Sequence, residues 1–205
     1  MSTTDRVLGS LCVRGIGAWT SGMPSWDTLR AVAVGEAGPD PHAPRKPAPE
    51  LLGPNERRRA PDTVLLALEA GLAACRAAKA DPANLASIFA STHGDLSITD
   101  AMCRTLVEAP TDVSPTRFHN SVHNAASGYW TIGCGCHAAS TAISAHRATL
   151  AQGLIESAMQ LASGEEAVLL VVYDGTATGP LAGMSASEGL FGLGLVLARA
   201  RPAEA

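Results

Sequence analysis

The chain has 205 residues, 46% of them hydrophobic and 4% aromatic, and its 15 Lys and Arg against 19 Asp and Glu give a net charge of −4. The length supports one or two domains, no basic block extends beyond the Arg57-Arg58-Arg59 run, and no apolar run approaches the roughly 20 residues that cross a bilayer, so neither nucleic-acid binding nor a membrane span is expected. The odd number of cysteines, five, and an amino terminus without the layout of a secretory signal indicate a reduced, cytoplasmic protein.

The first third of the chain predicts a strand, a helix and a long loop. Residues 6–13 alternate weakly between apolar and polar and lead into Gly15-Ile16-Gly17, which predicts a strand that ends in a tight turn. A helix is expected after Ser25. Residues 35–61 contain seven prolines, and this density predicts an extended surface loop without regular structure.

The middle of the chain predicts two helices around one strand. Apolar residues repeat at the helical period from Pro61 until Asp81-Pro82 stops them, which predicts a helix over 61–79. Residues 85–91 are typical of a short strand, and residues 98–108 of a helix. Residues 119–132 have no clear pattern.

The last third predicts strand, helix, strand and strand over 139–144, 145–162, 167–172 and 189–198. The helix is amphipathic, so we expect its polar side to face water. Its apolar arc contains Ala148, Ala151, Leu154, Ile155, Ala158, Met159 and Ala162, and the opposite arc contains Thr149, Gln152, Glu156, Gln160 and Ser163. The unbroken apolar run at 167–172 is typical of a strand buried on both faces of a parallel sheet. Alternating strands and helices indicate the α/β class, with a mixed, mostly parallel sheet.

Five segments share their order and spacing with a known family. These segments are GIGAWTSG, WDTLRAVAVGE, SPTRF, NAASG and GLFGLGLVLAR. In this arrangement the chain resembles the thiolase-fold β-ketoacyl synthases. The resemblance implies a thiolase-like half-fold over 1–205, a single domain similar to the amino-terminal domain of that family, with the amphipathic helix at its centre.

One departure from the family concerns the catalytic nucleophile. The family places its Cys at the start of the central helix, twelve residues after the first Gly of a Gly-x-x-Gly-Pro motif. The same count from Gly135 reaches Arg147, and Ala138-Ala139 occupy the Gly-Pro position. Arg cannot attack a thioester, and its charge opposes the helix dipole. We therefore expect no catalytic residue there, and an anionic partner for Arg147, either a carboxylate of another subunit or a carrier-protein phosphate, unless its side chain simply reaches into water.

A second departure is length, because the family's two catalytic histidines lie in a second half-domain that this sequence does not contain. The resemblance therefore implies a non-catalytic, chain-length-factor-type subunit of a bacterial type II polyketide pathway of the aryl polyene or xanthomonadin type. It also implies a heterodimer with a full-length ketosynthase, in which the strand near 139–144 pairs with the equivalent strand of the partner. Contact with an acyl carrier protein through the complex is implied as well. No cofactor is expected. The residues expected at the interface or the acyl tunnel are Phe118, His119, Asn120, His123, Asn124, Tyr129, Trp130, Ser140, Ile143 and Arg147.

Two other functions are compatible with the residues. Cys136 beside His137 could support an acyltransferase or a thioester hydrolase, and the chain could be a stand-alone module that binds acyl groups or an acyl carrier protein. A metal site is not expected, because Cys134, Cys136 and His137 lack a second ligand cluster. His119 and His123 are four residues apart and could share a helix face, but a structural role with hydrogen bonds is the preferred interpretation.

Overall fold

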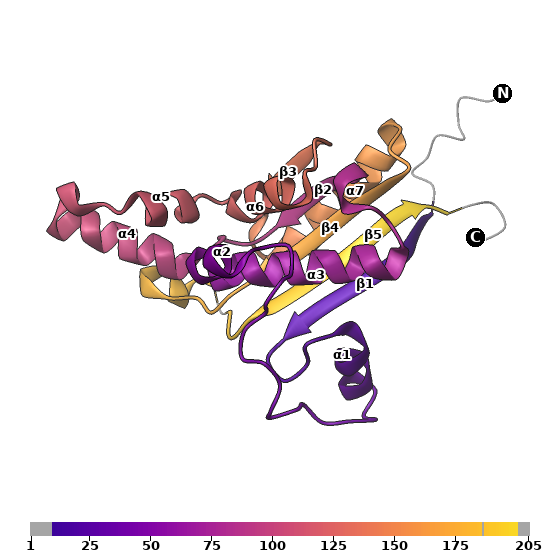
Figure 1. Cartoon of the computed structure of the whole chain (residues 1–205), viewed down its shortest axis with the longest axis horizontal. Helices are drawn as coiled ribbons and strands as arrows, with labels where there is room; N and C mark the ends of the chain where they lie inside the picture. The colour runs from indigo at the N-terminus through magenta and orange to yellow at the C-terminus, as the bar shows by residue number, and fades with distance from the viewer. Residues whose placement is uncertain (1–9, 186, 201–205) are drawn as a thin grey trace.

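The computed structural model describes residues 10–185 and 187–200. Their strands form one five-stranded sheet in the order β1-β5-β4-β2-β3 (Figure 1). The strands are β1 (Leu11–Thr20), β2 (Ala86–Ala90), β3 (Ser140–Ile143), β4 (Ala167–Asp174) and β5 (Phe191–Arg199). β2 is parallel to β3 and β4, whereas β5 is antiparallel to β1 and β4. The α/β class and the mixed sheet are confirmed, with parallel and antiparallel pairings in equal number.

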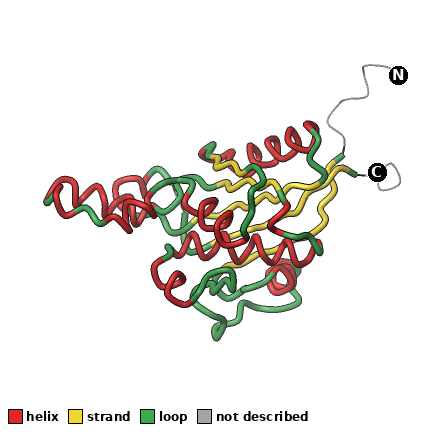
Figure 2. The backbone as a smooth tube through the Cα atoms, turned by 45° about the horizontal axis from the view of Figure 1, so that its top comes forward, coloured by secondary structure: helices red, strands yellow, loops and turns green. Residues whose placement is uncertain are grey.

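Seven α-helices accompany the sheet in the described part of the chain. They are α1 (Trp26–Ala33), α2 (Pro54–Arg59), α3 (Asp62–Ala78), α4 (Leu96–Glu108), α5 (Pro115–Ser121), α6 (Ala125–Cys134) and α7 (Thr149–Ser163). The expected helices after Ser25 and over 61–79, 98–108 and 145–162 are confirmed within a few residues. α4 and α5 lie side by side and extend beyond the end of the sheet as an arm (Figures 1 and 2). No helix of the described residues is long and apolar enough to cross a membrane.

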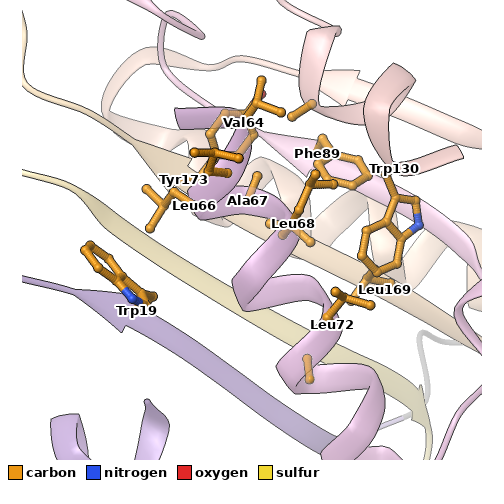
Figure 3. Close-up of a cluster of buried hydrophobic side chains, with 14 of the residues drawn as sticks. Trp19, Val64, Leu66, Ala67, Leu68, Leu72, Phe89, Trp130, Leu169 and Tyr173 are labelled. Atoms are coloured by element: carbon orange, nitrogen blue, oxygen red, sulfur yellow. The ribbon is translucent and has the colours of Figure 1, made fainter. Parts of the chain in front are cut away.

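The larger core lies between α3 and the sheet. α3 packs across β1, β5 and β4, while α6 covers β2 and β3 on the same side. Figure 3 shows the side chains of this core, in which Phe89 and Trp130 lie against each other with ring centroids 6.0 Å apart. Both residues are fully buried, and Leu68 and Leu72 of α3 complete the cluster.

The first strand differs from its prediction. β1 runs through Gly15-Ile16-Gly17, and residues 6–9 lie outside the described residues. The glycines allow α3 to approach, because a Cβ on Gly17 would overlap the carbonyl oxygen of Ala70. The tight turn expected at this motif is therefore wrong, and the chain instead reverses after Thr20, which bonds Met23.

The proline-rich segment also differs from its prediction. It contains the helix α2, whose first residue is Pro54, a position where the missing N–H has no intrahelical partner to lose. Pro47, Pro49 and Leu52 are buried, and Leu52 belongs to the core under α3. The segment therefore packs against the core and includes a helix of about one and a half turns. The prediction of no regular structure is confirmed for 35–53 and is wrong for α2.

A smaller core lies on the other face of the sheet, under α7 (Figures 1 and 2). α7 packs over β4 and β2, and its buried residues are Thr149, Gly153, Ser157 and Leu161. The apolar arc of the helix is not its buried side, because Ile155 is 55% exposed and Met159 is 51% exposed. The polar arc is half-buried beside β3, where Gln160 donates to Glu156. The expectation that water covers the polar side is therefore wrong, because the apolar arc is the more exposed of the two.

Candidate functional site

The carboxyl ends of β2, β3 and β4 meet at one edge of the sheet, because these three strands are parallel. The segments that follow them are joined by polar contacts. The carboxylate of Asp174 accepts hydrogen bonds from Ser91 Oγ (2.9 Å), from the backbone N–H of Thr92 (3.0 Å) and from Thr92 Oγ1 (2.8 Å). Ser144 Oγ donates to the carbonyl oxygen of Thr92 at 2.8 Å. These bonds fix the floor of a polar site.

Arg147 lies beside this floor. The chain leaves β3, turns at His146 with a φ of 51°, and enters α7 through the short 3-10 helix η3 (His146–Ala148). The Arg147 side chain is exposed and lines a cavity of about 510 Å³ together with Thr92, Asp174 and Met184. Within the described residues the guanidinium has no hydrogen bond or ion pair. A fixed positive charge is therefore open to an anion from outside this part of the chain.

Two further hollows lie near the Arg147 cavity. A polar cavity of about 310 Å³ shares Asp174, Ser185 and Ser187 with it and also contains His93 and Asp95. A predominantly apolar groove of about 510 Å³ shares Leu96 and Thr178 with the polar cavity and runs under the arm. This groove is lined by Cys103, Val107, Pro180 and Leu181 besides polar residues. The three hollows are therefore neighbours, with Arg147 lining one end of the series and apolar residues lining the other.

The segment 118–130 forms α5, a short break and α6. Phe118, His119 and Asn124 are exposed, and the ring of His119 lies against that of Tyr129 with centroids 5.8 Å apart. His123 lies beyond the end of α5, so it does not share a helix face with His119, and its Nε2 is 2.8 Å from the carbonyl oxygen of Ser91. His123 is therefore held within the polar site by a hydrogen bond.

Two of the expected interface residues lie inside the chain. Asn120 is buried; its Nδ2 donates to the carbonyl oxygen of Arg59 at 3.1 Å, and its Oδ1 accepts from the hydroxyl of Tyr129. Trp130 has no exposed surface and belongs to the core under α3. Both side chains hold α5 and α6 to the body of the protein, which leaves Phe118, His119 and Asn124 as the exposed residues of the expected set in this segment.

β3 is an edge strand of the sheet, and the side chains of Ser140 and Ile143 are half-buried. Ser140 Oγ is 2.7 Å from Ser127 Oγ and 2.9 Å from Ser87 Oγ, so hydroxyl contacts tie this strand to α6 and β2. Ile143 packs against the smaller core. One long side of β3 pairs with β2 and the other side has no strand beside it in the described structure.

Cys134 and Cys136 lie away from Arg147. Cys136 is 5% exposed, and its Sγ donates to the carbonyl oxygen of Leu85 at 3.6 Å, at the amino end of β2 and thus at the opposite edge of the sheet. Burial raises the pKa of Cys134 to about 12, with smaller contributions from Cys136 and Asp81. A buried thiol is a poor nucleophile for a thioester, which weighs against a covalent role for Cys136. Among the described residues, no three His, Cys, Asp or Glu side chains gather as metal ligands.

Sequence reasoning did not single out Ser91, Thr92 and Asp174 as a connected group. The signal was present, because Ser91 ends one predicted strand, Thr92 directly follows it, and Asp174 lies two residues beyond another predicted strand. Polar residues at the carboxyl ends of parallel strands meet at one edge of a sheet. Asp174 has no carboxylate partner at a useful spacing in the sequence, and its hydrogen-bond partners lie 82 and 83 residues away in the chain.

Comparisons with known proteins identify a family and similar folds for this chain. The family model described as β-ketoacyl synthase, N-terminal domain, matches residues 32–202. One similar structure is the ketosynthase ApeO in complex with its chain length factor ApeC from Xenorhabdus doucetiae, with a TM-score of 0.79 and 25% identity over 94% of this chain and 80% of that chain. No curated protein matches the sequence at a significant level.

Two further structures share the fold at lower identity. The ishigamide ketosynthase/chain length factor has a TM-score of 0.72 and 18% identity over 96% of this chain and 64% of that chain. The AntDE:AntF complex, a type II polyketide acyl-carrier protein with its ketosynthase bound to the hexaketide, has a TM-score of 0.71 and 16% identity over 93% of this chain and 63% of that chain. This chain therefore spans less than two thirds of these two relatives.

Proposed function

Because this chain belongs to the family of the β-ketoacyl synthase N-terminal domain, we propose that it is a non-catalytic, chain-length-factor-type subunit. It pairs with a full-length ketosynthase in bacterial type II polyketide synthesis of the aryl polyene type and shapes the acyl tunnel of that enzyme. The likeness to ApeO with ApeC supports this assignment, since that similarity extends over 80% of the matched chain.

The observation that carries the proposal is Arg147 at the entry of α7. A condensing enzyme needs a thiolate at this position, and the guanidinium neither loses a proton at physiological pH nor attacks a carbonyl carbon. The described cysteines nearest in sequence, Cys134 and Cys136, lie before β3, and the Cys136 thiol is buried. The partner ketosynthase supplies the nucleophile and the catalytic histidines, and Arg147 binds an anionic group at the shared site.

The open side of β3 is the proposed contact with the partner. The carbonyl oxygens of Ala139 and Ile143 accept hydrogen bonds from the N–H groups of Ser87 in β2 and of Ser91 directly after it. Because pairing alternates along a parallel strand, the N–H and C=O of Ala142 point to the open edge. A strand of the ketosynthase added there satisfies these groups, and the exposed Phe118, His119 and Asn124 extend the contact surface.

The hollows between Arg147 and the arm support a role in the acyl tunnel. Their apolar end, beside Val107 and Leu181, suits a growing hydrocarbon chain, and their polar end suits the thioester carbonyl. An acyl carrier protein reaches these hollows through the assembled complex, since its substrate must pass the partner's nucleophile. The length of the apolar end then limits the length of the product.

Co-expression with a full-length aryl polyene ketosynthase tests the pairing. We expect a stable one-to-one complex with the wild-type chain, measured by size-exclusion chromatography and native mass spectrometry. Ala142→Pro removes the edge N–H and is expected to weaken the complex at least tenfold, whereas Ala142→Ser keeps that N–H and is the matched control. Circular dichroism of both variants verifies that the chain folds. Failure of the wild-type pair to associate contradicts the proposal.

The chain alone gives a second test. A malonyl or acyl thioester probe is expected to leave no covalent adduct on Cys134 or Cys136 of the purified chain, since the thiol of Cys136 is buried and burial raises the pKa of Cys134. Rapid acylation of Cys136 would instead establish the alternative of an acyltransferase or hydrolase.

A further inference from the structure

The two faces of the sheet are covered unequally. On one face, α3 and α6 together extend over all five strands. On the other face, α7 packs over β4 and β2, and the smaller core is centred there. Strands lie about 4.8 Å apart and a helix with its side chains is about 10 Å wide, so a five-stranded sheet accommodates two helices side by side. The second position, over β5 and β1, is not filled by α7.

The strand residues beneath that second position are apolar. Leu197 belongs to the smaller core, and side chains alternate along a strand, so Leu195, Leu193 and Phe191 project from the same face. Their partners on β1 continue the surface. We call this surface the open face; it consists of Val13, Ile16, Phe191, Leu193 and Leu195, with the buried Ala18 opposite Leu193. Val13 and Phe191 are exposed and the other three are half-buried, so the surface is in contact with water in the isolated chain.

α7 turns its apolar arc toward the same region. Leu154 on the helix and Leu195 on β5 both pack against the smaller core, which makes the flank of α7 continuous with the open face. Ile155 and Met159 point outward beyond this flank, and each is about half exposed. The flank itself carries Ala151, Ala158 and Ala162, small residues that permit another helix to lie close.

We propose that the open face and the apolar arc of α7 form a self-complementary interface for a second copy of this chain. A two-fold axis places α7 of one copy over β5 and β1 of the other, so that each helix fills the position that the other sheet leaves open. The alanine flanks of the two helices then meet, and Ile155 and Met159 contact the partner's sheet. A second copy fits because each copy carries both parts of the interface: the apolar arc of α7, and the open face of β5 and β1 on which the partner's α7 packs.

Charge supports this occupant. The apolar arc contains no charged residue, and the face of β5 has one at its end, Arg199, which donates to the carbonyl oxygen of Leu161 on α7. Charged residues are depleted at the centre of stable interfaces. The polar arc of α7, with Glu156 and Gln160, lies on the other flank beside β3. The proposed homodimer and the proposed ketosynthase contact therefore use different surfaces, and both together give an assembly with two copies of each subunit.

The test uses the purified chain without a ketosynthase, so its outcome is independent of the proposed function. Light scattering is expected to give twice the chain mass of 21.0 kDa at micromolar concentration. Ile155→Lys is expected to give a monomer with an unchanged far-ultraviolet circular dichroism spectrum. Val107→Lys on the arm, which replaces an 84% exposed apolar residue, and Ser163→Lys on the polar side of α7 are matched controls that remain dimeric.

Two native methionines give a readout that needs no substitution. Met159 and Met184 are 51% and 69% exposed in the single chain, so a monomer oxidises both at similar rates with dilute hydrogen peroxide. In the dimer the partner's sheet covers Met159, and we expect its oxidation to be several-fold slower than that of Met184 by peptide mass spectrometry. A monomeric wild-type chain, equal oxidation of the two methionines in a dimer, or dissociation by Val107→Lys in place of Ile155→Lys overturns the proposal.

Discussion

Asp174 and Thr92 are joined twice, because the carboxylate accepts both the backbone N–H and the side-chain hydroxyl of Thr92. This double contact ties the end of β4 to the end of β2 across 82 residues of chain. It also fixes one wall of the cavity that Arg147 lines. Asp174 and Arg147 therefore line the same cavity from different elements. Of the two, only Asp174 has hydrogen-bond partners within the described residues.

Replacement of Asp174 by Ala is expected to destabilise the chain. The change removes three hydrogen bonds to a carboxylate and leaves the Ser91 and Thr92 donors without a protein partner, so we expect the free energy of unfolding to fall by about 2–4 kcal/mol. Urea denaturation measures this loss. Glu165→Ala at an exposed turn is the control and is expected to stay within about 0.5 kcal/mol of wild type. Equal effects of the two changes would contradict the structural role of Asp174.

Arg147 is expected to be unfavourable for the stability of the isolated chain. Its positive charge lies at the amino end of α7, where the helix dipole is also positive, so Arg147→Ala should raise the free energy of unfolding by about 0.3–1 kcal/mol at low salt. Arg30→Ala, in the last turn of α1 where a positive charge is favourable, is the control of opposite sign. A marked loss of stability in Arg147→Ala would show that Arg147 already has an anionic partner within the chain.

Local sequence patterns located most helices and strands, but they did not distinguish alternative uses of the same residues. The helical period after Pro61 and the apolar run at 167–172 both correspond to observed elements, because each buries a continuous apolar surface. Gly15-Ile16-Gly17 was interpreted as a turn, since glycine permits either a turn or a close approach. Whether these glycines form a turn or a close contact depends on α3. This helix begins 45 or more residues later in the chain, so a local sequence pattern does not include it.

The amphipathic helix illustrates a second limit. Its two arcs are as the sequence predicts, but the side that meets the sheet is the narrow row of Gly153, Ser157 and Leu161 between them. Small residues allow close packing without contributing to hydrophobicity, so periodicity alone did not identify the buried side. Prediction of the site from the sequence was limited in the same way. The count from Gly135 identified Arg147, whereas Ser91 and Asp174 become neighbours only through the order of strands in the sheet.

The thiols are expected to differ strongly in reactivity. Burial raises the pKa of both Cys75 and Cys134 to about 12, and the Cys136 thiol is buried against Leu85, whereas Cys103 is exposed. Iodoacetamide at pH 8 should therefore alkylate Cys103 first in the folded chain, as measured by peptide mass spectrometry. In urea all cysteines should react alike, which is the internal control. Prompt labelling of Cys136 in the folded chain would contradict its buried position.

The same shifts predict a loss of stability at alkaline pH. The folded state holds the protons of Cys75 and Cys134 more tightly than the unfolded state, in which a thiol has its ordinary pKa of about 9.0. The stabilisation is complete below that value and is lost as the pH rises toward 12. Urea midpoints between pH 8 and pH 11 should fall. The Cys75→Ala and Cys134→Ala double variant should show a shallower decline, and a residual slope is expected because burial also raises the pKa of Tyr173.

The contact between β1 and α3 depends on glycine at position 17. A Cβ there would overlap the carbonyl oxygen of Ala70, and this oxygen belongs to helix backbone that cannot rotate away. Gly17→Ala is therefore expected to lower the free energy of unfolding by about 1–3 kcal/mol through overpacking. Gly128 lies inside α6 with open space around the position of a Cβ, so Gly128→Ala is expected to stabilise the chain by about 0.5–1 kcal/mol. Both changes add one methyl group, and urea denaturation of the pair separates the effect of position from that of residue type. A shift of the same sign in both variants would contradict the close approach of α3 to β1.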